Sequence, residues 1–234
     1  MSKPQHPISI PFSRGWNIRR PYLYRYMKRE YVDRFFDDGT LRLSSFSYFG
    51  KHPDEERGDN QEGRGVVIHR NAEGEGQTIL SKMAKGIDTF ILCGSMRFSD
   101  DLARAFDTDS GFRIDDTTAF SDIVARHIPG FVQGAEGPCM YMARRMVVRD
   151  MGRIDFEAMK KGPGENYNID KLLQVMNTMA GDDLFYIKLI KYAHQSEYRL
   201  IWGARQIVGD YIEIKCPEAL QFCTRFEDLI AERA

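Results

Sequence analysis

The chain lacks any long hydrophobic run, because no stretch of about 18 consecutive apolar residues occurs in its 234 residues. Residues 1–13 are polar, contain proline and carry no apolar segment of the kind that a secretory leader requires. Cysteine is also scarce: the four cysteines are widely separated and form no C-x-x-C pair, which argues against a disulfide framework and against a zinc site. We therefore expect a cytoplasmic protein that does not insert into a membrane.

A surplus of charge of either sign is absent as well. Lys and Arg together number 33, and Asp and Glu together number 34, so the net charge of −1 provides no overall attraction to nucleic acid or to an anionic membrane. The signature motifs of P-loop, Rossmann, zinc-protease and α/β-hydrolase enzymes are missing, and the five histidines show no metal-ligand spacing. These absences weigh against the mechanisms that depend on those motifs.

The apolar content of 42% is sufficient for one large core. Residues 1–19 lack periodicity and form an N-terminal extension, whereas residues 20–234 alternate between strand and helix patterns as a single domain. Strands are predicted at 22–27, 40–45, 65–70, 77–80, 89–96, 111–114, 139–148, 195–203 and 206–215, and helices at 28–38, 100–106, 116–128, 156–160, 169–179 and 226–233. The pattern predicts an α+β fold with a mixed, largely antiparallel sheet flanked by helices, in which 195–203 and 206–215 form a hairpin.

Polar side chains that are typical of functional sites occur in three of these strands. The strand at 195–203 begins with Gln195 and Glu197, and a spacing of two residues places both side chains on one face of a strand. The strand at 22–27 carries one central cation, Arg25, among aromatic residues, and the strand at 40–45 ends in the hydroxyls of Ser44 and Ser45. The candidate site residues therefore follow the order arginine, serine, glutamate along the chain.

This order resembles the arginine, serine-threonine-serine and Gln/Glu-x-Glu pattern of the ADP-ribosyltransferase superfamily, whose members bind NAD in a split mixed sheet. The chain departs from that pattern at residues 44–47, which read Ser-Ser-Phe-Ser. It also resembles a bacterial domain family of unknown function linked to phage defence, through residues 23–26 (Leu-Tyr-Arg-Tyr) and 197–199 (Glu-Tyr-Arg). These resemblances imply a toxin or defence effector that consumes NAD, modifies a protein or nucleic acid, and has an antitoxin or regulatory partner.

The ADP-ribosyltransferase resemblance also implies a role for each candidate residue. Arg25 would hold the diphosphate or ribose of NAD, since an arginine fork matches phosphate oxygens, and Ser44 and Ser45 would support the nicotinamide-ribose pocket. Glu197 would contact the ribose 2′-hydroxyl, and Gln195 would orient the acceptor. The aromatic residue that stacks on nicotinamide is left open among Tyr24, Tyr26, Tyr48 and Phe49, with Tyr24 and Tyr48 retained as cofactor-binding candidates.

Two other functions are compatible with the sequence. Residues 51–63 form a polar, turn-rich segment, and its acidic side chains at 54–62 could supply the oxygen ligands of a divalent ion in a nuclease or phosphodiesterase. The candidate ligands among them are Asp54, Glu55, Asp59 and Glu62. Their spacing matches no known metal loop, and charged runs usually face water. The remaining alternative is a non-catalytic ligand-sensing or interaction module.

Overall fold

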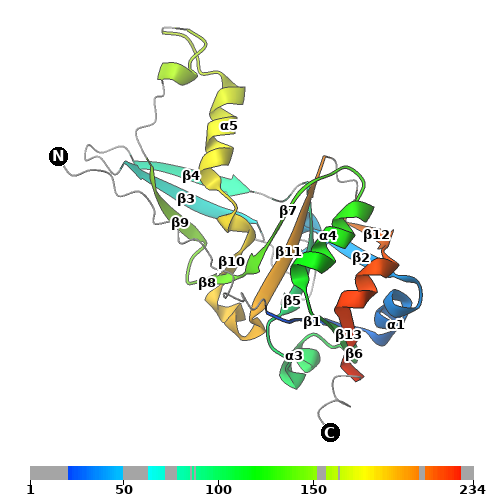
Figure 1. Ribbon diagram of the computed structural model, residues 1–234. Helices are drawn as coiled ribbons and strands as arrows, with labels where there is room; N and C mark the ends of the chain where they lie inside the picture. The colour runs from blue at the N-terminus through cyan, green and yellow to red at the C-terminus, as the bar shows by residue number, and fades with distance from the viewer. Residues whose placement is uncertain are drawn as a thin grey trace, which may run out of the picture.

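The computed structural model describes residues 21–49, 63–71, 78–84, 86, 88–151, 157–162, 164–205 and 209–227. Within these residues, an antiparallel sheet of eight strands forms the centre of the fold (Figure 1). Its strands are β1 (Leu23–Met27), β2 (Thr40–Ser45), β5 (Thr89–Ser95), β6 (Ser110–Ile114), β7 (Phe131–Pro138), β11 (Glu197–Ala204), β12 (Tyr211–Lys215) and β13 (Cys223–Arg225). Helices flank this sheet, so the α+β class with a largely antiparallel sheet is confirmed.

The sheet is split at β5. Along one edge, β5 pairs with β11 over its whole length, from Thr89 to Ser95. Along the other edge, β5 pairs with β2 only at Phe90 and Ile91, and with β1 only at Ser95. Strands β1 and β2 therefore diverge from a common edge, and Cys93 lies at the fork between them.

The main core lies on one face of the sheet, under α1 (Arg29–Asp38), α4 (Thr117–His127) and the 3-10 helix η4 (Pro217–Phe222), which Figure 1 shows together on that side. Alternate residues of β2, β5, β6, β11 and β12 point into this core, as the two-residue period of a strand requires. Buried members of the core include Leu23, Phe35, Leu43, Leu92, Phe112, Phe120, Leu200 and Trp202. The Trp202 indole also donates to the Ser121 carbonyl oxygen at 3.1 Å, which fixes β11 to α4.

Helix α1 begins and ends where its sequence predicts. Its apolar residues Val32 and Phe35 are buried, and Gly39 follows its last residue in the left-handed conformation, with φ 75°. The Gly39 N–H donates to the Phe35 carbonyl oxygen at 2.8 Å and closes the helix. A Cβ atom at this position would lie only 2.4 Å from the backbone nitrogen of Pro217, so both the turn and the packing require glycine.

Two smaller sheets lie beside the main one. Strand β3 (Arg64–Asn71) pairs antiparallel with β4 (Thr78–Ala84) and parallel with β9 (Met146–Met151), and Figure 1 shows this sheet and α5 (Ile169–Ala180) projecting from the eight-stranded sheet. Strand β10 (Ile187–Leu189) pairs in parallel with β8 (Met140–Met142). The remaining elements are α2 (Phe46–Phe49), α3 (Asp100–Ala105) and the 3-10 helices η1 (Glu157–Met159), η2 (Asp183–Phe185) and η3 (Ile190–Gln195).

Several sequence-based expectations need correction. The strand expected at 139–148 is two strands, β8 and β9, in different sheets. Strand β7 was not predicted; its eight residues include two glycines, which weaken a strand pattern. The expected hairpin of 195–203 with 206–215 does not form: β11 is occupied on both edges by β5 and β7, so β12 pairs with β2 instead. The extension at 1–19 and most of the helix expected at 226–233 lie outside the described residues.

No helix in the described part of the chain is long and apolar enough to cross a membrane. All four cysteines are free thiols, and two of them, Cys139 and Cys216, are buried. Burial raises the pKa of the Cys216 thiol to about 12, so this cysteine packs as a small apolar residue at neutral pH.

Candidate functional site

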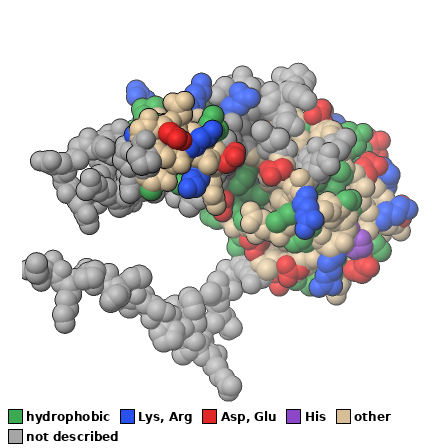
Figure 2. All heavy atoms as spheres, turned by 90° about the horizontal axis from the view of Figure 1, so that it is seen from above, with side chains coloured by type: hydrophobic (Ala, Val, Ile, Leu, Met, Phe, Trp, Pro, Cys, Tyr) green, Lys and Arg blue, Asp and Glu red, His purple; other side chains and the backbone are tan. Residues whose placement is uncertain are grey.

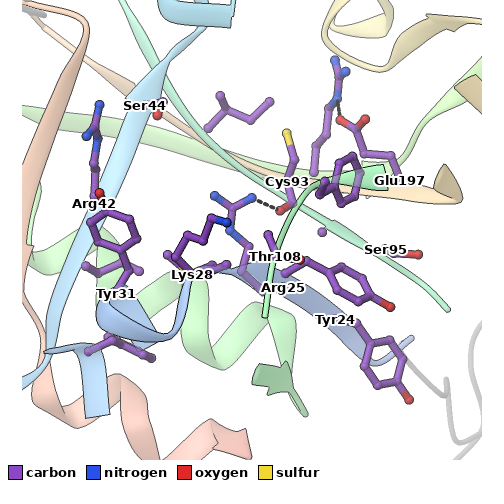
Figure 3. A pocket seen from close by; sticks show the side chains of 18 of the residues that line it. Tyr24, Arg25, Lys28, Tyr31, Arg42, Ser44, Cys93, Ser95, Thr108 and Glu197 are labelled. Atoms are coloured by element: carbon purple, nitrogen blue, oxygen red, sulfur yellow. Dashed lines mark hydrogen bonds and ion pairs between the residues drawn. The ribbon is translucent and has the colours of Figure 1, made fainter. Parts of the chain in front are cut away.

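A pocket of about 320 Å³ opens at the fork of the sheet, and we call it the fork pocket (Figure 3). This volume is within the range of about 300–1,000 Å³ that is usual for small-molecule sites. The lining comes from β1, α1, β2, α2, β5, β10, η3, β11 and β12, and from Phe106 and Thr108 in the loop between α3 and β6. Because β1 and β2 separate there, the pocket reaches from the residues beside α1 to the face of the sheet that carries Glu197.

Arg25 projects from β1 into the fork. Its Nη1 atom donates to the carbonyl oxygen of Cys93 at 2.6 Å (Figure 3). On this edge of β5, Cys93 lies after the residues that pair with β2 and before the residue that pairs with β1, so neither strand pairs with it. The guanidinium therefore supplies the hydrogen-bond donor that a neighbouring strand would otherwise provide. The predicted arginine therefore lies in the fork pocket.

Glu197 is the first residue of β11 and is only 6% exposed. One carboxylate oxygen accepts from Arg199 Nε at 2.6 Å, and the other accepts from the ammonium group of Lys188. The same ammonium donates to Gln195 Oε1 at 2.6 Å. Lys188, Gln195, Glu197 and Arg199 thus form one buried group, which we call the Glu197 cluster.

Two cations flank one carboxylate in the Glu197 cluster, and this arrangement determines the ionisation of Glu197. Burial alone would raise the pKa of Glu197, but the charges of Arg199 and Lys188 and their hydrogen bonds outweigh burial and hold that pKa well below its ordinary value. Glu197 is therefore ionised at neutral pH, and the cluster carries a net charge of one positive unit.

The small sheet of β8 and β10 holds the Glu197 cluster in place. Lys188 of β10 and Tyr141 of β8 are paired neighbours in this sheet, and the Tyr141 hydroxyl accepts from the Glu197 N–H at 2.6 Å. Burial raises the pKa of Tyr141 to about 12, so the hydroxyl keeps its proton at neutral pH. Arg199 is anchored in turn by donating from Nη1 to the Phe185 carbonyl oxygen. Both the backbone and the side chain of Glu197 are therefore fixed.

Gln195 is not on the same strand as Glu197, contrary to the expectation from their spacing. It ends the 3-10 helix η3, and Ser196 follows with φ 43°, in the left-handed region, before β11 begins. The two side chains nevertheless come together, because both accept a hydrogen bond from Lys188. Their proximity depends on a lysine that the spacing rule did not include.

The two predicted serines diverge. Ser44 lines the fork pocket, whereas Ser45 is fully buried and is not part of its lining. Successive residues of β2 point to opposite faces of the sheet, and Ser45 shares the face of the core residue Leu43. The structure thus places one of the two serines in the lining that also contains Arg25 and Glu197.

The two candidate aromatics also line the pocket, in different settings. Tyr24 is 7% exposed and packs against Phe98 and Phe226, with ring centroids 5.6 and 6.4 Å away, so it belongs mainly to an aromatic core. Tyr48 of α2 lies less deeply, with its ring 5.5 Å from the Arg42 guanidinium. Tyr48 is the better placed of the two to contact a ligand.

The lining of the fork pocket is cationic, although the whole chain is nearly neutral. The face of the molecule in Figure 2 shows acidic and basic side chains interspersed. The described residues that line the pocket, in contrast, include six cations and two carboxylates, which are Arg25, Lys28, Arg34, Arg42, Lys188 and Arg199, with Glu197 and Glu213. Such a lining favours an anionic ligand.

Sequence reasoning missed Lys188, Arg199 and Arg42. Lys188 is the only charged residue in the apolar run at 184–190, a pattern that indicates a buried and paired cation. Arg199 follows Glu197 by two residues on the same strand, so the period of the strand could have predicted their contact. Arg42 carries no comparable signal, because nothing in its local sequence indicates a pocket.

Metal chemistry finds no support in the described part of the chain. No group of three or more His, Cys, Asp or Glu side chains is arranged there to hold a metal ion. The acidic side chains at 54–62 lie outside the described residues, so the nuclease alternative stays a prediction.

Comparison of the chain with protein-family models, with curated proteins and with solved structures gives no significant match. We therefore infer function from the side chains of the fork pocket and from the resemblance of three short motifs to those of the ADP-ribosyltransferase superfamily.

Proposed function

We propose that the chain is an ADP-ribosyltransferase-like enzyme that consumes NAD in the fork pocket and acts as a toxin or defence effector on a macromolecular acceptor. One observation carries the proposal. Arg25, Ser44 and Glu197, which are far apart in the sequence and lie on β1, β2 and β11, line the same pocket at the split of the sheet. This is the arrangement that the resemblance to the superfamily implies.

The chemistry of the lining supports a dinucleotide ligand. Arginine forks suit the oxygens of a diphosphate, and the aromatic side chains of the lining suit the flat rings of a nucleotide. Aromatic members of the lining are Tyr24, Tyr26, Tyr31, Phe35, Tyr48, Phe49 and Phe106. A ligand with both phosphates and planar rings uses both features.

The proposed reaction breaks the bond between the nicotinamide nitrogen and C1′ of the ribose. The bonding electron pair leaves with nicotinamide, which becomes neutral, and positive charge develops on the ribose. The acceptor nucleophile, or water, then bonds to C1′ and loses a proton. A fixed carboxylate such as Glu197 stabilises the developing cation in a site of low dielectric constant, as in glycoside hydrolysis.

A second candidate is a non-catalytic module that binds a nucleotide. It is favoured by the Glu197 cluster, because Lys188 and Arg199 already neutralise the carboxylate that the reaction needs. With a net positive charge, the cluster is well suited to a bound anion. This candidate predicts binding of NAD or ADP-ribose without release of nicotinamide.

The test is to measure nicotinamide release from NAD by chromatography. We expect release by the wild type and a rate at least about 100-fold lower for Glu197→Gln, the loss typical of removing one group that stabilises developing charge. Glu227→Gln is the matched control, because Glu227 also forms an ion pair with an arginine but lies outside the pocket.

Circular dichroism and urea unfolding should accompany the rates, since Glu197 is buried. If Glu197→Gln does not fold, Arg25→Gln provides a second variant, for which we expect a raised KM for NAD. Full release in a folded Glu197→Gln would rule out the proposed role of this carboxylate. Chelator-sensitive cleavage of nucleic acid by the wild type would favour the nuclease alternative.

A further inference from the structure

Arg42 differs from the other cations of the fork pocket because it has no polar partner among the residues that the structure describes. It lies on β2, two residues before Ser44 and on the same face, and it is half-buried in the lining. With the residues that the structure describes, its guanidinium makes two ring contacts, over Tyr211 at 3.6 Å and over Tyr48 at 5.5 Å, and no hydrogen bond or ion pair.

The carboxylate opposite Arg42 on the neighbouring strand is already engaged. Glu213 is its direct neighbour across the β2–β12 pair. However, each carboxylate oxygen of Glu213 accepts from a different nitrogen of Arg34, and both distances are 3.1 Å. Lys28 is paired in a similar way with Asp107, at 2.9 Å. Protein carboxylates thus compensate the charges of Arg34 and Lys28, whereas no carboxylate in the described part of the chain compensates the charge of Arg42.

The position of Arg42 suits it to hold a ligand. The ring of Tyr211 supports one face of the guanidinium, which limits its motion and leaves the N–H donors along its edge available. Phosphate is the group that such a planar fork recognises through two parallel hydrogen bonds. We propose that Arg42 is a phosphate-binding residue of the fork pocket.

This inference rests on the proposed function and specifies the ligand further. Figure 3 shows Arg42 at one end of the pocket, Glu197 at the other and Arg25 between them. If the nicotinamide ribose lies at Glu197, the phosphate at Arg42 is either the diphosphate of NAD or the additional 2′-phosphate on the adenosine ribose of NADP. The shared requirement is a phosphate at the end of the pocket remote from Glu197.

Isothermal titration calorimetry of the full chain with inorganic pyrophosphate, NAD and NADP tests the inference. We expect all three to bind the wild type, and Arg42→Gln to weaken binding of at least one of them by about tenfold or more, as is typical for a lost charge-assisted hydrogen-bond pair. Arg42→Lys should recover only part of the affinity, because lysine has no planar fork. Arg29→Gln should bind as the wild type does, since Arg29 pairs with Glu227 outside the pocket.

The pattern of losses identifies the phosphate. A loss that affects pyrophosphate and NAD assigns Arg42 to the diphosphate, whereas a loss confined to NADP assigns it to the 2′-phosphate. Unchanged affinity of Arg42→Gln for all three probes, or no binding of any probe to the wild type, would overturn the inference. Binding that depends on Arg42 without any nicotinamide release would instead leave the inference standing and contradict the proposed enzymatic function.

Discussion

The two ends of the fork pocket handle charge in opposite ways. At one end, Glu197 is buried, and both of its oxygens are engaged by cations from β10 and β11. At the other end, Arg42 is half-buried and is supported by tyrosine rings, without a carboxylate partner in the described residues. The charge of Glu197 is compensated within the protein, whereas the charge of Arg42 has no described carboxylate to compensate it and is the one that we propose a phosphate binds.

This difference separates what holds the pocket together from what the pocket can bind. A buried ion pair is strongly destabilised when one partner is removed, because the other charge remains without compensation. A half-exposed arginine on an aromatic ring contributes little to stability and can exchange its water for a phosphate. Substitutions at the Glu197 end should therefore affect folding, and substitutions at the Arg42 end should mainly affect binding.

The largest effect on stability is expected for Glu197→Ala. This change leaves Lys188 and Arg199 buried without their carboxylate and should lower the free energy of unfolding by about 3–5 kcal/mol. Glu213→Ala removes a carboxylate of the same pocket whose pair with Arg34 is exposed, so it should cost no more than about 1 kcal/mol. Urea unfolding followed by circular dichroism measures both values, and equal losses would contradict the contrast between the two ends.

An intermediate effect is expected for Lys188→Met, which should change how the free energy of unfolding varies at acidic pH. Because the folded-state pKa of Glu197 is depressed, its carboxylate stabilises the fold above the ordinary glutamate pKa of about 4.3. That stabilisation falls by about 1.4 kcal/mol per unit as the pH drops below this value toward the folded-state pKa. The charged or titratable groups in contact with Glu197 are Lys188 of β10, Arg199 of β11 and Tyr141 of β8.

Removing the Lys188 charge should raise the pKa of Glu197 toward its ordinary value. The stability of Lys188→Met should therefore decline less between pH 5 and pH 3 than the stability of the wild type. Urea midpoints at several pH values measure the two slopes. Identical slopes would show that Lys188 does not control the ionisation of Glu197.

The smallest effect on stability is expected for Tyr211→Ala at the Arg42 end. Tyr211 is 46% exposed, and a cation–π contact at such a site is worth about 0.5–1 kcal/mol. The same substitution should nevertheless weaken binding of pyrophosphate, because Arg42 loses its support. Tyr22→Ala is the control, since Tyr22 is 41% exposed and its ring lies 4.5 Å from the Arg113 guanidinium, outside the fork pocket. A loss of stability above about 2 kcal/mol for Tyr211→Ala would mean that this end is part of the folding core.

Local patterns predicted the early part of the fold well. The helix at α1 and its neighbours β1 and β2 lie within one residue of their expected bounds, because aromatic strand residues, helical spacing and Gly39 are all local signals. The prediction was wrong where pairing is decided by distant segments. Tyr211–Lys215 has the composition of a hairpin partner for β11, yet β5 and β7 occupy both edges of that strand.

The candidate site was predicted in its residue types and only partly in its geometry. Arg25, Ser44 and Glu197 were expected together, and all three line the fork pocket. Ser45 faces the core instead, and Gln195 reaches Glu197 through Lys188 and not along a strand. Whether these residues act on NAD stays a prediction.

The sequence by itself determined the α+β class, the near-neutral charge and which side chains were suited to a site, because composition and local periodicity depend only on neighbouring residues. The tertiary structure alone decided that β1 and β2 would leave β5 on either side of Cys93 and that Lys188 and Arg199 would flank Glu197. It also decided that Arg42 would have no carboxylate partner among the described residues. The physical reason is that strand pairing and charge compensation depend on which distant segments come within contact distance, and that choice minimises the free energy of the whole chain.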